Sequence, residues 1–281
     1  MRTRTLLTTA AVVATALLAP HSAHAQSAED EIRALANHPA VRRALDHVEA
    51  RDAQTMADLR ELTEIPAPPF MEEARGARFL EMLRDAGVDS AWVDTEGNVL
   101  GLRRGSGSGS VVAVTGHLDT VFPEGTDVSI RMAGDTLYAP GIADDTRGLA
   151  AMLAILRALN EAEVQTDADL LFVGTVGEEG QGDLRGVKHL FRADGPRIDA
   201  FISIDGTGHE GITHQGLGSH RYRVTMRGPG GHSWGAFGLG NPAHALGMAI
   251  DYFVAYADTL TRSGPRTSYN VGTIGGGTSV N

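Results

Sequence analysis

The sequence contains no cysteine among its 281 residues. Disulfide bonds and thiolate metal sites are therefore excluded, and any metal ion has to be bound by histidine and carboxylate side chains. Basic residues are also few: 24 Lys and Arg stand against 35 Asp and Glu, which gives a formal net charge of -11. A chain this acidic has no general electrostatic attraction to nucleic acid or to anionic membrane surfaces. We therefore expect neither as a partner.

A long apolar run of the kind that crosses a membrane is missing as well. The stretch Leu6–Ala19 is apolar apart from a few threonines, and it is shorter than the ~20 residues that a spanning helix needs. It follows Arg2 and Arg4 and precedes the small-x-small sequence Ala23-His24-Ala25. These three features are typical of a signal peptide. We predict a signal peptide over residues 1–25 and a secreted or periplasmic mature protein without membrane attachment; the alternative is an uncleaved amphipathic tail.

The chain has enough hydrophobic residues to form a packed core. The hydrophobic fraction is 42%, as in ordinary globular proteins, and the length allows one large domain or two small ones. Three short apolar runs have the character of buried strands and are separated by helical patterns. Strand, helix, strand, helix, strand in succession predicts an α/β fold with a mainly parallel sheet flanked by helices. The runs are Val111–Thr115, Leu170–Val176 and Ala200–Ile204.

Other patterns surround these runs. Apolar spacing predicts helices and glycine turns predict hairpins. The expected elements are a helical region over Glu29–Ile65, a helix over Glu72–Ala86, strands on both sides of Glu96-Gly97, a short edge strand over Arg131–Leu137 and a helix containing Leu149–Leu156.

The pattern of the sequence changes after Thr213, where the alternation of apolar runs and helical patterns ends. Alternating residues predict strands over Ser219–Met226 and Ser268–Ile274, and Asn241-Pro242 is typical of a helix start. This α+β unit looks incomplete at Asn281. We therefore predict a catalytic domain over residues 26–212 and a partial lid or dimerisation domain over residues 213–281.

Polar residues follow each apolar run where the predicted strand ends. The segments are Gly116-His117-Leu118-Asp119, Gly177-Glu178-Glu179 and Asp205-Gly206, and Asp144-Asp145 precedes a predicted helix. The carboxyl ends of parallel strands meet at one edge of an open α/β sheet, and ligands bind there. An imidazole and several carboxylates at that edge make a zinc-type site plausible.

Each cluster also has a simpler interpretation. His117 and Asp119 could form a polar turn, or Asp119 could orient a metal-binding His117 through its second ring nitrogen. Asp145 and Thr146 could simply cap a helix, or Asp144 could bridge two cations at the about 3.5–4 Å spacing of two-metal hydrolases.

The carboxylates after the second and third apolar runs also have both a structural and a functional interpretation. Glu178 and Glu179 could be a solvated pair, or one could bind metal while the other acts as general base. Asp205 alone could be a turn residue. The functional interpretation is favoured over these simpler ones because several such clusters occur together, most of them directly after apolar runs whose ends meet at one edge of the sheet.

Taken in order, the motifs resemble those of the M20 metallopeptidase family. That family includes glutamate carboxypeptidase, tripeptidase-like enzymes, and acetylornithine or succinyl-diaminopimelate deacylases. The resemblance covers about Ala53 to Asn281, with Thr146 as a departure where many relatives carry Lys. The segments that carry it are Leu62–Pro66, Gly116–Thr120, Gly141–Gly148, Gly177–Gly180, Asp205-Gly206, Gly231-His232-Ser233 and Gly276–Asn281.

The resemblance implies a site with two zinc ions. It makes His117 and Asp205 ligands of one zinc, Glu179 a ligand of the other, Asp144 the bridge between them, Glu178 the general base and Asp119 the residue that orients His117. It also implies a cis peptide bond between Asp144 and Asp145. His232 matches a lid histidine that, in dimeric relatives, reaches the partner subunit's site and polarises the scissile carbonyl; the alternative is an ordinary loop histidine.

The implied function is a secreted di-zinc hydrolase that cleaves amide bonds of small peptides, with a possible homodimer through the lid. Two alternatives stay open: an N-acyl amino acid deacylase of the same family, and a non-catalytic binding protein on the same scaffold. Glu178 disfavours the binding protein, which has no need of a base. The family's final His ligand is absent from this chain, which leaves Asp144 and Glu179 for the second zinc. We therefore expect the chain as written to bind at most one zinc tightly.

Overall fold

The computed structural model describes residues 20–107, 109–206, 208 and 211–281. The chain separates into two compact units, the first ending at Gly211 and the second spanning Ile212–Asn281. Most of the predicted signal peptide falls on residues 1–19, outside the described residues. Among the residues that are described, no helix combines the length and apolar character needed to cross a membrane.

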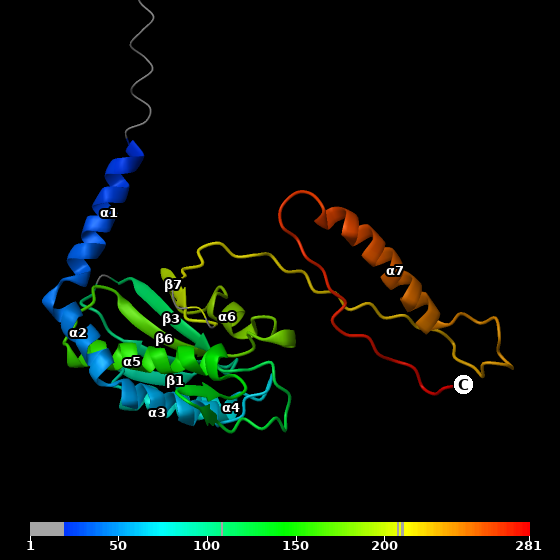
Figure 1. Ribbon diagram of the computed structural model, residues 1–281, viewed down its shortest axis with the longest axis horizontal. Helices are drawn as coiled ribbons and strands as arrows, with labels where there is room; N and C mark the ends of the chain where they lie inside the picture. The colour runs from blue at the N-terminus through cyan, green and yellow to red at the C-terminus, as the bar shows by residue number, and fades with distance from the viewer. Residues whose placement is uncertain (1–19, 108, 207, 209–210) are drawn as a thin grey trace, which may run out of the picture. The chain divides into compact units, whose positions relative to one another are not determined.

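The first unit is built on a five-stranded sheet (Figure 1). β3 pairs in parallel with β6 on one side and with β7 on the other, whereas β2 pairs antiparallel with both β6 and β1. The predicted fold class, a mainly parallel α/β sheet flanked by helices, is confirmed for this unit. The strands in spatial order are β1 (Ser90–Val93), β2 (Val99–Arg103), β6 (Asp169–Thr175), β3 (Val111–His117) and β7 (Ala200–Ser203).

Helices connect the parallel strands and cover the sheet. α5 (Arg147–Glu161) lies between β3 and β6 in the chain, and α6 (Arg185–Leu190) lies between β6 and β7. α5 packs on β3, while α4 (Glu73–Asp85) packs on β1 and β2. α2 (Pro39–Ala50) and α3 (Asp52–Thr63) pack on α5 as an outer layer.

The predicted helical region over Glu29–Ile65 is divided into three helices. α1 (Pro20–Ala36) ends before His38, whose side chain caps α2 by accepting a hydrogen bond from the Ala40 amide at 3.3 Å. Pro39 then occupies the first helical position, where its missing N–H costs nothing. A second break occurs at Arg51, whose φ of -109° and ψ of 18° are not helical.

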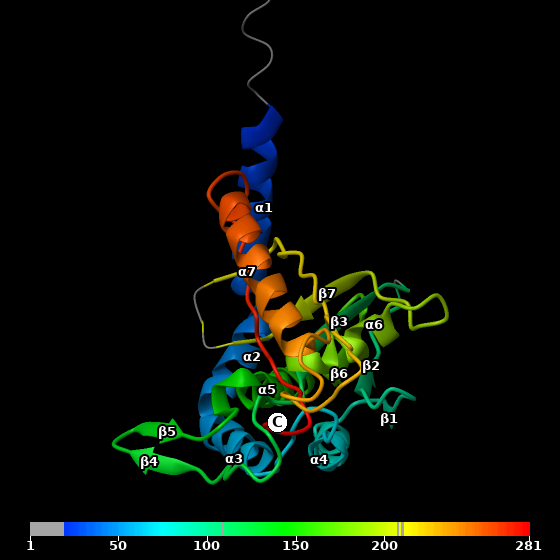
Figure 2. The same ribbon diagram turned by 90° about the vertical axis from the view of Figure 1, so that its right-hand side faces the viewer.

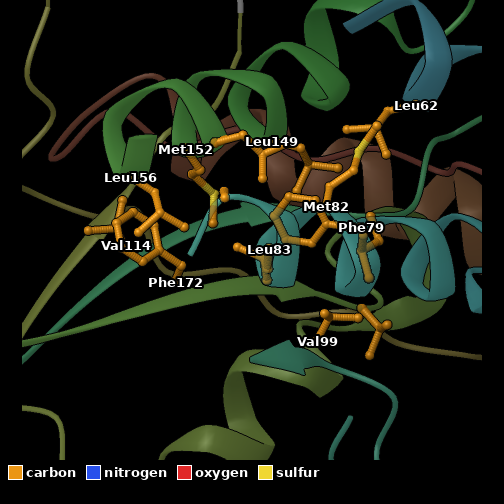
Figure 3. Packing of buried hydrophobic residues seen from close by; sticks show 14 residues of the cluster. Leu62, Phe79, Met82, Leu83, Val99, Val114, Leu149, Met152, Leu156 and Phe172 are labelled. Atoms are coloured by element: carbon orange, nitrogen blue, oxygen red, sulfur yellow. The ribbon is translucent and has the colours of Figure 1, made fainter. Parts of the chain in front are cut away.

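Two apolar clusters lie on opposite faces of the sheet because successive side chains of a strand point to opposite sides. Phe172 of β6 joins the cluster under α4 and α5, whereas Leu171 and Val173 join a second cluster with Leu190 of α6. Figure 3 shows the first cluster, in which side chains of the two helices meet those of the sheet. Its labelled members are Leu62, Phe79, Met82, Leu83, Val99, Val114, Leu149, Met152, Leu156 and Phe172.

The predicted single edge strand over Arg131–Leu137 is wrong. The segment forms a separate two-stranded hairpin of β4 (Arg131–Ala133) and β5 (Thr136–Tyr138), which Figure 2 shows beside α3. Gly134 has a φ of 64° and allows the chain to reverse within this segment. The hairpin therefore adds no strand to the main sheet.

The second unit contains α7 (Pro242–Thr261) and long extended segments. Asn241 begins the helix as predicted, because its side chain accepts hydrogen bonds from the amides of Ala243 and His244 at 2.9 and 3.3 Å. The strands predicted over 219–226 and 268–274 are wrong: within residues 212–281, all of which are described, neither segment pairs with another. A strand needs the backbone hydrogen bonds of a neighbour, and alternation of side chains alone does not provide them.

The first apolar cluster predicts where the fold is sensitive. Phe79 is fully buried, so Phe79→Ala leaves a cavity and should lower the free energy of unfolding by about 3–5 kcal/mol. Phe237→Ala is the matched control, since Phe237 is 92% exposed. Urea unfolding of both variants gives the comparison, and equal losses would contradict the assignment of Phe79 to the core.

Candidate functional site

The candidate site lies at the carboxyl ends of the parallel strands. His117 is the last residue of β3, Glu178 and Glu179 follow β6, and Asp205 follows β7. Asp144 comes from the turn that precedes α5. The ligand atoms of His117, Asp144 and Asp205 lie within 4.8 Å of one another, and so do those of His117, Glu178 and Glu179. The fold thus brings together side chains that are up to 88 positions apart, with His117 common to both groups.

His117 stands at the centre of this arrangement and is almost completely buried. Its Nε2 is 2.8 Å from an oxygen of Asp144 and 3.8 Å from an oxygen of Asp205. Its Nδ1 faces Asp119, with the backbone carbonyl at 3.0 Å and the carboxylate at 3.6 Å. Asp119 therefore lies on the side of the ring expected of an orienting residue, although its carbonyl is closer to the ring than its carboxylate.

The buried carboxylate of Asp119 has a second contact. It accepts hydrogen bonds from the backbone amides of Glu178 at 3.1 Å and Glu179 at 2.9 Å. Burial by itself would raise the pKa of Asp119, but His117 and these two amides outweigh burial and lower the pKa below its ordinary value. Asp119 thus stays ionised and fixes the Glu178-Glu179 turn against the end of β3.

Asp145 links the next turn to the same strand. Its carboxylate is buried and accepts hydrogen bonds from the amide of His117 at 3.0 Å and from the amide of Gly148 at 3.1 Å. The peptide bond between Asp144 and Asp145 is cis, as the resemblance implied. Burial, reinforced by Asp205 and Asp144 and opposed by His117, raises the pKa of Asp145 to about 7. The helix-capping interpretation holds for Asp145, whose carboxylate binds the Gly148 amide in the first turn of α5, but is wrong for Thr146, which precedes α5 without a side-chain cap. The bond from Asp145 to His117 could not be read from the sequence.

Sequence reasoning missed Arg75, which supports the site from α4. Its side chain is fully buried and donates to the carbonyl of Leu118 at 2.7 Å and to that of Ile65 at 2.7 and 3.0 Å. Burial lowers its pKa to about 10, although Asp119 opposes this shift. Arg75 thereby joins the Ile65-Pro66 segment to the turn between His117 and Asp119. The sequence did hold one indication that Arg75 is buried: it lies one helical turn before Phe79 and so on the same face of the helix.

The departure at Thr146 also has a structural explanation. Thr146 is fully buried, and its hydroxyl lies 2.7 Å from that of Thr63 in α3 and 2.9 Å from the carbonyl oxygen of Gly141. A small polar side chain satisfies both neighbours in this space. Thr146 therefore connects α3 to the turn that contains Asp144.

The crowding of carboxylates around His117 favours a bound cation. Burial and the neighbouring carboxylates raise the pKa of Glu178 and Glu179, with His117 opposing. Nitrogen and oxygen donors from histidine and carboxylate residues are ligands that zinc accepts in catalytic sites. The side chains of Asp144 and Asp205 are about half exposed, which leaves the group open to solvent and substrate.

Two other features lie outside this group. His232 belongs to the second unit, where it is exposed and accepts a hydrogen bond from the Trp234 amide at 3.2 Å; its predicted role stays a prediction. A groove of about 610 Å³ among α2, α3, α4 and α5 contains none of the predicted site residues. We assign the site from the convergence of donor atoms rather than from this groove, which has no such convergence among the described residues.

The charge of His117 predicts how stability of the metal-free protein depends on pH. Burial would lower its pKa, but contacts with Asp119, Asp145 and Asp144 outweigh burial and raise the pKa from 6.5 to about 10. Because the folded state binds this proton more tightly, the stabilisation is complete below about pH 6.5 and is lost as the pH rises through 10. The melting temperature of chelator-treated protein should therefore fall across this interval.

His117→Gln removes the titrating group and should reduce this fall. The control is His244→Gln on the exposed surface of α7, which should leave the pH dependence of the wild type intact. If the melting temperature of His117→Gln fell with pH as steeply as that of the wild type, folding would not raise the pKa of His117.

Comparison with known proteins agrees with the motifs. Residues 113–274 match the model of peptidase family M20/M25/M40. A putative LysW-lysine/LysW-ornithine hydrolase of Pyrococcus abyssi is 33% identical over 169 residues, which are 60% of this chain and 45% of that protein. Carboxypeptidase G2 of a Pseudomonas species is 30% identical over 158 residues, 55% of this chain and 37% of that protein.

Further matches are less similar in sequence. A succinyl-diaminopimelate desuccinylase of Corynebacterium glutamicum is 26% identical over 196 residues, 69% of this chain and 53% of that protein. The crystal structure of aminopeptidase PepT from Bacillus cereus is 24% identical with a TM-score of 0.47, covering 55% of this chain and 43% of that one. The chain spans about half the length of these relatives or less. Because the family match covers more than half of the chain, the resemblance is confirmed: the chain belongs to peptidase family M20/M25/M40.

Proposed function

We propose that this chain carries the metal site of a zinc-dependent hydrolase that cleaves amide bonds of small peptides. The observation that carries the proposal is the placement of Asp144 and Asp205 around Nε2 of His117, beside the Glu178-Glu179 turn. Membership of a peptidase family supports the same reaction class. No other set of metal-binding side chains of this kind occurs among the described residues.

The donor set divides into two parts. His117, Asp144 and Asp205 would bind one zinc ion, and Glu179 together with the shared Asp144 would contribute to a second. When bound, zinc supplies a Lewis acid that polarises the scissile carbonyl and lowers the pKa of water. The half-exposed carboxylates of Asp144 and Asp205 face the solvent from which metal and substrate arrive.

Glu178 is the proposed general base. It would take a proton from the attacking water and later transfer that proton to the leaving nitrogen of the amide. Asp119 fixes the direction of its backbone through the hydrogen bonds to the amides of Glu178 and Glu179. A base has to be positioned before its pKa matters, and this turn provides the position.

Two alternative functions use the same residues. The desuccinylase among the relatives supports an N-acyl amino acid deacylase, which needs the same metal site and base. A non-catalytic binding protein would retain the scaffold without a use for Glu178. We favour hydrolysis because Glu178 is present together with the complete His117, Asp144 and Asp205 group.

The wider setting is also part of the proposal. The acidic chain with its predicted signal peptide is proposed to act outside the cytoplasm. The second unit is proposed as a lid through which two copies associate, with His232 reaching a bound substrate. Exposed apolar residues of α7, including Met248, Tyr252 and Tyr256, support a partner for that helix.

A substrate panel tests the proposed function. Purified protein is incubated with dipeptides, tripeptides and N-acyl amino acids, before and after removal of metal and after zinc is restored. Zinc-dependent release of amino acids from peptides supports the proposal, and release from N-acyl amino acids alone supports the deacylase. Binding without turnover of any member of the panel would favour the binding protein.

Glu178→Gln tests the general base. The amide cannot accept a proton, so turnover should fall by about 10²–10⁴-fold while metal content stays at the wild-type level. Glu161→Gln at the exposed end of α5 is the matched control and should keep full turnover. Near-normal turnover by Glu178→Gln would overturn the role assigned to Glu178.

A further inference from the structure

Arg147 makes a contact that neither the motifs nor the proposed mechanism uses. It is the first residue of α5 and follows directly on the Asp144-Asp145-Thr146 turn. Its Nη2 donates hydrogen bonds to the backbone carbonyls of Gly206 at 2.5 Å and Gly208 at 3.2 Å. Arg147 therefore connects the turn that contains Asp144 to the turn that follows Asp205.

Among the described residues, few hydrogen bonds hold the backbone on either side of Asp205. Within the part of the chain that the structure describes, β7 is an edge strand that pairs with β3 alone, and all four of its residues are exposed. The last backbone hydrogen bond before the turn joins the Ile204 amide to the Thr115 carbonyl at 2.8 Å. Asp205 itself is nearly half exposed, and its nitrogen neighbour at Nε2 of His117 is 3.8 Å away. Its carboxylate thus depends on the backbone around it for its position.

The location of Arg147 is unfavourable for the helix itself. The N-terminus of a helix carries a partial positive charge, so acidic side chains stabilise the first turn and cations do not. The guanidinium donates instead to the carbonyls of Gly206 and Gly208, which are strong acceptors for a charged donor. Arg147 thus contacts the turn after Asp205 from a position where its charge does not stabilise α5.

We propose that Arg147 is a positioning residue that sets the separation of the Asp144 and Asp205 carboxylates around His117. We call the connection made by the Arg147 side chain the tether. Its one end is joined to Asp144 through the backbone of the turn before α5, and its other end is joined to Asp205 through the hydrogen bond to the Gly206 carbonyl. Loss of the guanidinium lets the Asp205 turn move relative to Asp144, so the two carboxylates no longer meet the same cation together. The inference rests on the proposed metal site.

Metal binding tests the tether without any measurement of turnover. Zinc affinity is measured by competition with a chromophoric chelator, and the geometry of the site is measured by the visible absorption of bound Co²⁺. Arg147→Ala should weaken zinc binding by about 10–100-fold, as changes to residues that orient metal ligands usually do. It should also shift the Co²⁺ spectrum, and Arg147→Lys should restore part of both because it keeps one donor.

The matched control is Arg197→Ala. Arg197 pairs with Asp199 just before β7, at the opposite end of the same strand, and its loss should leave zinc affinity and the Co²⁺ spectrum unchanged. A purely structural role for Arg147 predicts a lower melting temperature with unchanged metal affinity and spectrum. That result would overturn the inference.

The wild type and His117→Ala separate this inference from the proposed function. Zinc binding that requires His117 but is insensitive to Arg147→Ala overturns the tether and leaves the proposed metal site standing. Zinc binding that does not require His117, or no binding at all, overturns both. Zinc binding that requires His117 and weakens in Arg147→Ala, with partial rescue by Arg147→Lys, supports the tether.

Discussion

The candidate site depends on the buried carboxylate of Asp119. This one group lies beside the imidazole of His117 and accepts hydrogen bonds from the backbone amides of Glu178 and Glu179. It therefore joins the end of β3 to the turn after β6 at the point where the proposed metal ligands and the proposed base meet. A buried carboxylate is stable only if its lone pairs are satisfied, and here the partners that satisfy it are the very groups whose positions matter.

A common principle appears in the residues around it. Asp119, Asp145, Arg75 and Arg147 all bond to backbone groups of neighbouring turns. Contacts to the backbone fix where a turn lies and leave the side chains of that turn available for chemistry. His117, Asp144, Glu178, Glu179 and Asp205 are then free to face one another. Burial and, after it, the repulsion among these carboxylates raise the pKa values of Glu178 and Glu179, which is the electrostatic argument for a cation at this edge.

Much of this arrangement could be predicted from particular residues. The apolar runs ending in His117 and Asp205 predicted parallel strands, and parallel strands place their carboxyl ends together. The spacing of Leu149, Met152, Leu153 and Leu156 predicted α5, and the Asn241-Pro242 start of α7 is also confirmed. The predictions failed where a partner decided the outcome. The segments 219–226 and 268–274 have alternating side chains, but in their unit neither finds a strand to pair with.

The sequence by itself determined the fold class of the first unit, the family and the set of candidate ligands, because periodicity and motif order are local properties. Tertiary structure alone decided which backbone groups Asp119 and Asp145 bind, that Arg75 is buried beneath the His117 turn, and that Arg147 meets Gly206. Those contacts join residues from 28 to 60 positions apart. They arise only when the strands are side by side, because no local pattern specifies which distant carbonyl or amide will come within hydrogen-bonding distance of a given side chain.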